Sequence, residues 1–185
     1  MKIIKYFFEF VSVLSLFVIF KIIGLKNASN LGSLLGQYIG PFFRSKKIIR
    51  KNIKIGLGDL NEEQIKNIMH GMWSNIGRTF SEYVYLKEFR EDKKNINYVK
   101  INGLNYLEEI KKNAAPVIFF SGHFGNIELI KMQLTKLDIK FAALHRPVNN
   151  IFLEPLKEYL RLKYVCNNYI SKGRMNVREI IKKIK

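Results

Sequence analysis

The stretch that most constrains the fold lies near the middle of the chain, where an apolar run leads into a glycine-containing turn and then an amphipathic segment. Residues 116–120 are apolar and rich in β-branched and aromatic types, which favours a buried strand over a helix. From Ile127 onward apolar residues recur at helical spacing, and Asn126 stands where a helix N-cap is expected. The stretch therefore predicts a strand, a turn and a helix in succession.

The turn carries His123 between Gly122 and Gly125, and Glu128 follows His123 by five residues. In open α/β sheets ligands bind at the carboxyl ends of strands, and glycines there let the backbone approach a substrate closely. From the first helical turn, the Glu128 carboxylate could reach one imidazole nitrogen and stabilise the imidazolium that forms when the other accepts a proton. Since the pair lacks a nucleophile of its own, we expect His123 to deprotonate a substrate hydroxyl. The alternative is that His123 caps the turn and Glu128 is a solvated residue at a favourable end of the helix dipole.

Three segments resemble one known family. Residues 121–129, Ser-Gly-His-Phe-Gly-Asn-Ile-Glu-Leu, resemble the His-x4-Asp/Glu block of the bacterial lipid A late acyltransferases, the lauroyl/myristoyl transferase family. Residues 145–150, His-Arg-Pro-Val-Asn-Asn, resemble its Tyr-Arg-Pro-x-Asn-Asn segment, and residues 72–83 resemble its upstream Asn-x-Gly-Arg-Thr-x-x-Glu helix. The three blocks occur in the family's order.

The resemblance implies an α/β fold in which N-terminal membrane-anchoring helices precede a glycerolipid-acyltransferase-like mixed or parallel sheet flanked by helices. We expect residues 1–25 to form the membrane anchor helix and residues 26–185 the acyltransferase domain. The sheet is expected to be incomplete, because the C-terminal part of the family has no counterpart in the chain.

The implied reaction is acyl transfer from an acyl carrier protein thioester to a hydroxyacyl group of a lipid A precursor, a step of lipopolysaccharide biosynthesis. His123 would be the general base, and Glu128 would orient it and balance its charge. No metal and no organic cofactor are expected, because the thioester is already activated.

A capping box at residues 61–64 predicts a helix from there to about Phe89. A second strand is predicted at residues 139–144, and helices at residues 103–113, 151–164 and 176–184. A strand, a helix and a strand of this length favour a parallel pair, which would place Arg146 at the same sheet edge as His123. A guanidinium there suits a phosphate or a developing oxyanion, whereas a structural salt bridge is the alternative.

The family resemblance assigns five residues to substrate binding. Arg146, with the backbone at Gly125 and Asn126, would stabilise the oxyanion or hold a glucosamine phosphate. Arg78 and Glu82 would face the active-site groove, although their i,i+4 spacing could equally support only their own helix.

The charge balance points to anionic partners. The chain has 32 Lys and Arg against 15 Asp and Glu, a net charge of +17. Such a protein attracts nucleic acid, anionic lipid or an acidic protein, but no nucleic-acid-binding motif is present. The charge thus favours anionic partners other than nucleic acid, and the family resemblance implies that these are the acyl carrier protein, the anionic lipid A precursor and the inner membrane. The single cysteine, Cys166, excludes an internal disulfide.

The N-terminal segment is apolar enough to attach the chain to a membrane. Residues 3–25 are long enough for a spanning helix if Lys5 and Lys21 extend their charges to the interface. We expect a bacterial inner-membrane protein, single-pass or peripheral, with its catalytic side in the cytoplasm. The alternative is a soluble hydrophobic helix packed on the domain.

Two other functions compete with lipid A acylation. One is an inactive, truncated membrane-associated remnant. The other is a glycerolipid acyltransferase, in which the acid of the motif is normally Asp and a Pro-Glu-Gly-Thr-type phosphate loop follows; the chain has neither feature.

Overall fold

A computed structural model describes residues 2–92, 98–113 and 116–171. The helix predicted at residues 176–184 lies outside these ranges. The chain divides into two compact units, of which unit 1 comprises Met1–Val13 with Leu86–Lys185 and unit 2 comprises Leu14–Tyr85. Each unit is described by itself below.

The N-terminal helix α1 (Lys2–Ile23) contributes its first half to unit 1 and its second half to unit 2. It ends at Gly24, whose φ of 81° lies in the left-handed region that glycine adopts without strain. The prediction of a helix at the N-terminus is confirmed, whereas the domain boundary at residue 25 stays a prediction.

Unit 2 is helical. After α1 it continues through α2 (Leu25–Ile39), the short 3-10 helix η1 (Gly40–Phe42), α3 (Lys46–Leu57), α4 (Glu62–Glu82) and a second 3-10 helix η2 (Tyr83–Tyr85). Helix α4 begins with the predicted capping box, in which Asn61 Oδ1 accepts from the Gln64 backbone at 2.9 Å and Gln64 Oε1 accepts from the Asn61 backbone at 3.0 Å.

Helices α2 and α4 contact each other through their backbones. Gly32, Gly36 and Gly40 are spaced four apart, so they share one face of α2 and its end. A Cβ added at Gly36 would overlap the Trp73 carbonyl oxygen, and one added at Gly77 would overlap the Gly32 carbonyl oxygen. The absence of side chains at these positions is therefore what permits the close approach.

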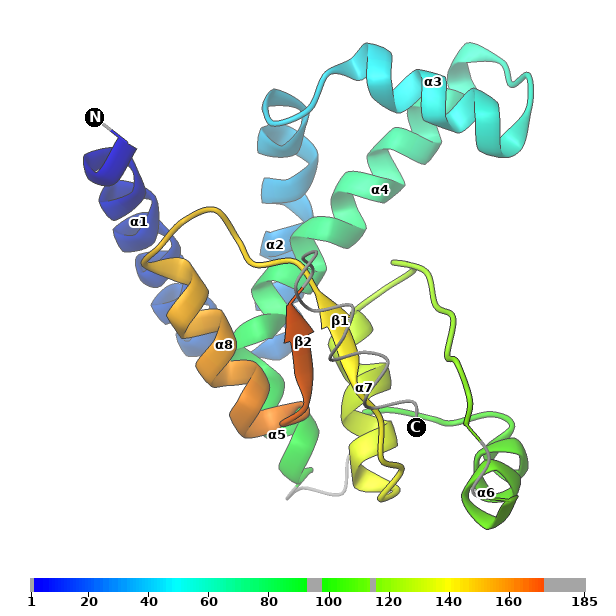
Figure 1. Cartoon of the computed structure of the whole chain (residues 1–185). Helices are drawn as coiled ribbons and strands as arrows, with labels where there is room; N and C mark the ends of the chain where they lie inside the picture. The colour runs from blue at the N-terminus through cyan, green and yellow to red at the C-terminus, as the bar shows by residue number, and fades with distance from the viewer. Residues whose placement is uncertain (1, 93–97, 114–115, 172–185) are drawn as a thin grey trace. The chain divides into compact units, whose positions relative to one another are not determined.

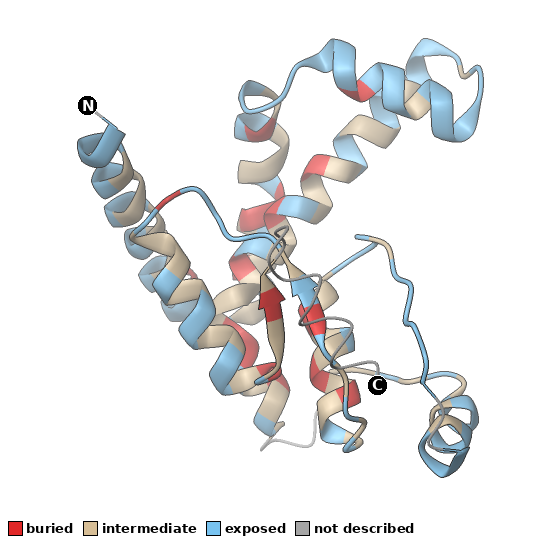
Figure 2. Cartoon of the chain, viewed as in Figure 1, coloured by how far each residue is buried: buried red, intermediate tan, exposed pale blue. Residues whose placement is uncertain are grey.

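Unit 1 contains helices on either side of a short βαβ arrangement (Figure 1). After the first half of α1 its elements are α5 (Leu86–Glu91), α6 (Leu104–Asn113), α7 (Ile127–Lys136), β1 (Ala143–His145), α8 (Leu153–Tyr164) and β2 (Tyr169–Ser171). Strands β1 and β2 are parallel, with Ala143 opposite Tyr169 and His145 opposite Ser171. Figure 2 shows the buried residues of this unit on both strands, α7 and α5, where they include Met132, Ile170 and Leu86.

The prediction of a strand at residues 116–120 is wrong. This segment belongs to no sheet, and its side chains are exposed, with Ile118 at 73% and Phe120 at 91%. A strand is stable only when a neighbouring strand satisfies its backbone groups, and β1 instead pairs with β2 downstream. Over the part of the chain that the structure describes, the α/β character thus rests on two strands, and the predicted pairing of residues 116–120 with residues 139–144 is not formed.

Candidate functional site

The candidate site is built around Glu128, which lies in the first turn of α7. Asn126 caps this helix by accepting a hydrogen bond from the Glu128 backbone at 3.2 Å, as its position in the sequence predicts. The Glu128 side chain is almost fully buried, at 1% exposure. A carboxylate in this position needs partners, since burial without them is costly.

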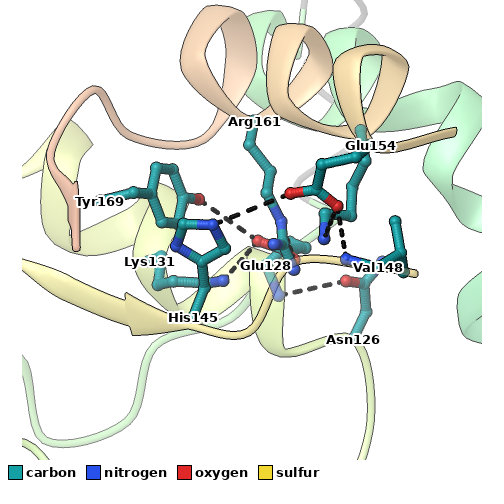
Figure 3. Close-up of polar contacts among 9 residues, drawn as sticks. Asn126, Glu128, Lys131, His145, Val148, Glu154, Arg161 and Tyr169 are labelled. Carbon is teal, nitrogen blue, oxygen red and sulfur yellow. Dashed lines mark hydrogen bonds and ion pairs between the residues drawn. The ribbon is translucent and has the colours of Figure 1, made fainter. Parts of the chain in front are cut away.

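Three side chains from three elements supply those partners (Figure 3). Arg161 of α8 donates to Glu128 Oε1 through Nε at 2.7 Å and also through Nη2. Lys131 of α7 lies 2.5 Å from Oε2, and the hydroxyl of Tyr169 in β2 donates to Oε2 at 3.5 Å. Glu128 thereby ties α7 to α8 and β2, and we call Glu128, Lys131, Arg161 and Tyr169 the Glu128 cluster.

The electrostatics of the Glu128 cluster follow from burial and from its excess of positive charge. Burial lowers the pKa of Lys131, although the Glu128 carboxylate opposes that shift. Burial and the negative charge of Glu128 raise the pKa of Tyr169, so its hydroxyl stays protonated and can donate. The Lys131 and Arg161 charges also lie over the Tyr169 ring, at 5.3 and 5.6 Å from its centroid.

A second carboxylate, Glu154, holds the loop that follows β1. Its Oε2 accepts from the Val148 backbone at 2.6 Å and lies 2.7 Å from Lys157 Nζ. Burial is the largest single influence and would raise the pKa of Glu154, but the two hydrogen bonds and the nearby positive charge of Lys157 and His145 together lower it. His145 Nε2 is 3.8 Å from Glu154 Oε1, and its ring meets the Tyr169 ring edge-on at 5.4 Å. Burial, together with Arg161 and Lys157, lowers the pKa of His145, which favours the neutral imidazole.

Asn150 ends this loop and is buried, at 6% exposure. Its Oδ1 accepts from the backbone of Phe152 at 3.0 Å and Leu153 at 3.3 Å, at the start of α8. Its Nδ2 donates to the Tyr6 carbonyl oxygen at 2.9 Å and to Glu9 Oε2 at 3.0 Å. The motif residue Asn150 therefore joins the loop after β1 to the first half of α1.

His123 lies in a different environment from Glu128. It is exposed on the turn before α7, and within the described ranges it forms no hydrogen bond or ion pair. The predicted hydrogen bond between His123 and Glu128 is therefore not formed in this structure, and the catalytic roles of both residues stay predictions. Gly125 is exposed as well, and an added Cβ there would meet no atom within 4 Å.

The other predicted site residues are divided between the units. Arg146 is exposed directly after β1 and has no polar partner among the residues described. In unit 2, Arg78 Nη1 donates to Ser29 Oγ at 3.1 Å and to Asn30 Oδ1 at 3.0 Å, while Glu82 Oε1 accepts from Ser29 Oγ at 3.2 Å. Arg78 and Glu82 thus hold α4 against α2, and their place in an active-site groove stays a prediction. No group of three His, Cys, Asp or Glu residues that could hold a metal ion occurs in the described part of the chain.

Comparison with protein families decides the identity. A family model described as bacterial lipid A biosynthesis acyltransferase matches residues 1–185, the whole chain. The chain belongs to this family. Comparison with curated proteins found no match, and neither did comparison with solved structures. The resemblance carried by the three sequence blocks is confirmed.

In this member of the lipid A acyltransferase family, sequence reasoning missed the partners of Glu128. Arg161 and Tyr169 lie 33 and 41 residues downstream of Glu128, so no local spacing connects them to it. Lys131 stands at i,i+3 to Glu128 and was open to recognition as an ion-pair partner. Asn150 directly precedes a predicted helix, and this position is a cap signal.

Proposed function

We propose that this chain transfers a fatty acyl group from an acyl carrier protein thioester to a hydroxyl of a lipid A precursor, at the cytoplasmic face of the bacterial inner membrane. The observation that carries the proposal is the family match over the whole chain. Donor, acceptor and membrane side go beyond that match and are part of the proposal.

His123 is the proposed general base. Its imidazole is exposed and forms no contact that would compete with a substrate hydroxyl within the described ranges. As His123 accepts the hydroxyl proton, the hydroxyl oxygen attacks the thioester carbonyl carbon and forms a tetrahedral intermediate. Collapse of this intermediate breaks the carbon–sulfur bond, and the imidazolium returns the proton to the departing thiolate.

Glu128 is proposed to position His123. Arg161 and Lys131 already balance the Glu128 charge, so its negative charge is only partly available to an imidazolium. Direct pairing with His123 would require the imidazole to replace the Tyr169 hydroxyl, whose 3.5 Å hydrogen bond is the longest in the cluster. Without that exchange, Glu128 acts by fixing the first turn of α7, two residues after the glycine turn.

The substrate anions are proposed to bind at Arg146, with the backbone at Gly125 and Asn126. Arg146 is exposed and not committed to a carboxylate among the described residues, so its guanidinium is free to bind phosphate or a developing oxyanion. Open space surrounds Gly125. The net charge of +17 would attract both the acidic carrier protein and the phosphorylated lipid.

The test is acyl transfer by purified chain in vesicles, supported by complementation of a strain that lacks the late acyltransferase. His123→Ala should reduce kcat about 10²- to 10⁴-fold, the usual contribution of general base catalysis. His70→Ala is the matched control, because His70 is also exposed but lies on α4. Full activity of His123→Ala would contradict the mechanism.

The same assay separates the competing functions. A wild-type chain that folds but transfers no acyl group to any acceptor would identify an inactive remnant. Transfer to glycerol phosphate rather than to a lipid A precursor would identify a glycerolipid acyltransferase. Glu128→Gln distinguishes a positioning role from direct pairing, because only direct pairing shifts the kcat pH profile as well as lowering kcat.

A further inference from the structure

Helix α3 in unit 2 and the residues just before it carry a dense cluster of positive charge. Residues 10–58 contain no Asp or Glu at all. Positions 44–54, by contrast, hold six cations, which are Arg44, Lys46, Lys47, Arg50, Lys51 and Lys54. The positive charge of this segment is therefore not balanced from within it.

Two of the six cations are neutralised by acidic residues that follow α3. Arg50 donates to the two carboxylate oxygens of Glu62 at 2.7 and 2.6 Å, and Lys54 lies 2.7 Å from an Asp59 carboxylate oxygen. The remaining four are exposed and form no hydrogen bond or ion pair with any part of the chain that the structure describes. These unpaired cations are Arg44, Lys46, Lys47 and Lys51.

The unpaired cations do not stabilise α3. Lys46 and Lys47 lie in its first turn, at the positive end of the helix dipole, where cations are unfavourable. Lys47 and Lys51 form an i,i+4 pair of like charge, which is also unfavourable. A helix face that serves only to keep a protein soluble normally mixes both signs of charge. The cluster is therefore better explained by an anionic partner than by the folding of α3.

Exposed apolar side chains accompany the cations. Ile49 is the buried residue of α3, whereas Ile48 and Ile55 are 43% and 74% exposed. Figure 2 shows that α3 is exposed along most of its length. Just before the helix, Phe42 and Phe43 are 88% and 80% exposed. We call the exposed side chains of residues 42–55 the α3 surface.

The pattern of apolar residues on α3 favours a protein partner over a bilayer. A helix embedded in a bilayer interface needs a continuous apolar strip. Asn52 lies at i,i+4 to Ile48 and three residues before Ile55, so it interrupts their row on the helix. Isolated apolar or aromatic side chains within a polar rim are instead typical of protein interfaces. The four unpaired cations require that such a protein be acidic.

We infer that the α3 surface is the docking site of an acidic protein, and that this protein is the acyl carrier protein of the proposed function. The inference rests on the proposed function for the identity of the partner, and on charge complementarity for the location of the contact. Docking here holds the body of the carrier protein and takes no part in bond making. Arg44, Lys46, Lys47 and Lys51 are thus binding residues and not catalytic ones.

Binding of a carrier protein that lacks its prosthetic arm tests docking apart from chemistry. The full chain is held in neutral phosphatidylcholine nanodiscs, because α1 is long and apolar enough to cross a membrane. Fluorescence anisotropy of the labelled apo carrier protein gives Kd. Lys47→Glu combined with Lys51→Glu should raise Kd about tenfold, because two attractive charges become repulsive.

A matched control separates the α3 surface from the overall charge of the chain. Lys87→Glu combined with Lys112→Glu changes the net charge equally, and both lysines are exposed in unit 1. This control should change Kd less than about twofold, because salt screens charges that lie outside the contact.

Two further measurements keep the result interpretable. A carboxylate at position 47 suits the first turn of α3, so the double variant should fold, and unchanged emission from Trp73 in unit 2 checks this. Ile55→Ser should also raise Kd without any change of charge, and its effect should persist at high salt, where the effect of the lysine changes declines.

Other results would overturn the inference. Equal effects of the two double variants would show that only the overall charge attracts the carrier protein. If the wild-type chain does not bind the carrier protein, the inference is wrong; loss of binding to phosphatidylglycerol vesicles in the α3 variant would then identify a membrane contact instead. Acyl transfer tests the proposed function separately. Docking without transfer would reject the reaction alone, whereas transfer with an unchanged KM for the acylated carrier protein in the α3 variant would reject the docking site alone.

Discussion

Different forces stabilise the interior of each of the two compact units. In unit 2, α2 and α4 approach so closely that glycines are required at the contact. In unit 1, α7, α8 and β2 meet around a buried carboxylate with two cationic partners. The first contact depends on shape and tolerates no added atoms, whereas the second depends on charge and tolerates no missing partner.

The chain provides one local probe for each unit. Its single tryptophan, Trp73, is buried in unit 2 and lies against Gly40, and its single cysteine, Cys166, is buried in unit 1. Trp73 fluorescence and Cys166 thiol reactivity during denaturant titration therefore report the two units separately. The predictions below use these probes to test whether the two forces are as distinct as the geometry indicates.

The largest effect is expected from Glu128→Ala. The substitution leaves Arg161 and Lys131 partly buried beside each other without their anion, which costs about 3–5 kcal/mol. Cys166 should become reactive at much lower denaturant concentration, while the Trp73 transition moves less. Glu158→Ala removes an exposed carboxylate from α8 and should change either transition by less than about 0.5 kcal/mol. Equal effects of the two substitutions would contradict a stabilising Glu128 cluster.

Gly77→Ala is the corresponding test of unit 2. The new methyl group would overlap the Gly32 carbonyl oxygen and force α2 away, at a cost of about 1–3 kcal/mol. Gly71→Ala lies on the same helix with no atom near the added Cβ, so it should stabilise by about 0.5–1 kcal/mol through helix propensity. The Trp73 transition should therefore move to lower denaturant concentration for Gly77→Ala and to higher concentration for Gly71→Ala. A stabilising effect of Gly77→Ala would show that α2 and α4 are farther apart than described here.

Helix caps provide an effect of the same size in both units. Asn61 caps α4 in unit 2 and Asn126 caps α7 in unit 1. Each change to alanine should cost about 1 kcal/mol. Asn61→Ala should shift mainly the Trp73 transition and Asn126→Ala mainly Cys166 reactivity. If either variant shifted the transitions of both probes equally, the two units would unfold as one. The units would then differ in the contacts that stabilise them but not in their stability.

The smallest effect is a pH dependence confined to unit 1. Because the folded pKa of His145 is lowered, the unfolded state binds its proton first, and stability falls as pH drops below the ordinary histidine value of about 6.5. Further loss follows below about pH 4.5, as Glu154 is protonated. Hydrogen exchange, corrected for its intrinsic pH dependence, should show this loss in α8 and the strands. His145→Gln should remove the loss of stability that begins below about pH 6.5. If the pH dependence of this variant were the same as that of the wild type, the assignment of this loss to His145 would be wrong.

In unit 2, the surface pair Arg50–Glu62 should add little to the response to acid. Arg50 lowers the pKa of Glu62, but both side chains are exposed and solvent screens their interaction. Hydrogen exchange in α2 and α4 should therefore change less than in unit 1 over the same pH range.

The sequence predicted features whose causes are local. Asn61 with Gln64, and Asn126 before Ile127, place helix starts correctly because capping involves residues two or three apart. The apolar periodicity of residues 151–164 likewise predicts α8, although the helix begins at Leu153. The family blocks identified the family because they compare whole motifs rather than single spacings.

Features that depend on distant partners could not be predicted. The apolar run at residues 116–120 has the composition of a buried strand, yet composition does not determine which strand will be its neighbour. Gly32, Gly36 and Gly40 show helical spacing, but their contact partner on α4 lies more than thirty residues away. Sequence reasoning placed Glu128 and His123 together because they are five residues apart, whereas the Glu128 carboxylate binds side chains that no short motif connects to it.

The burial of Phe20 has a practical consequence for anyone preparing this protein. Hydrophobic N-terminal helices are commonly deleted to improve expression, but starting this chain at Gly24 would remove the aromatic ring and the carbonyl oxygen that Phe80 and Tyr85 use, and would leave Asn150 without two acceptors. Such a shortened form would expose apolar side chains and leave polar groups without hydrogen-bond partners, and it would aggregate. Detergent micelles or nanodiscs around the intact chain are the preparation that its architecture favours.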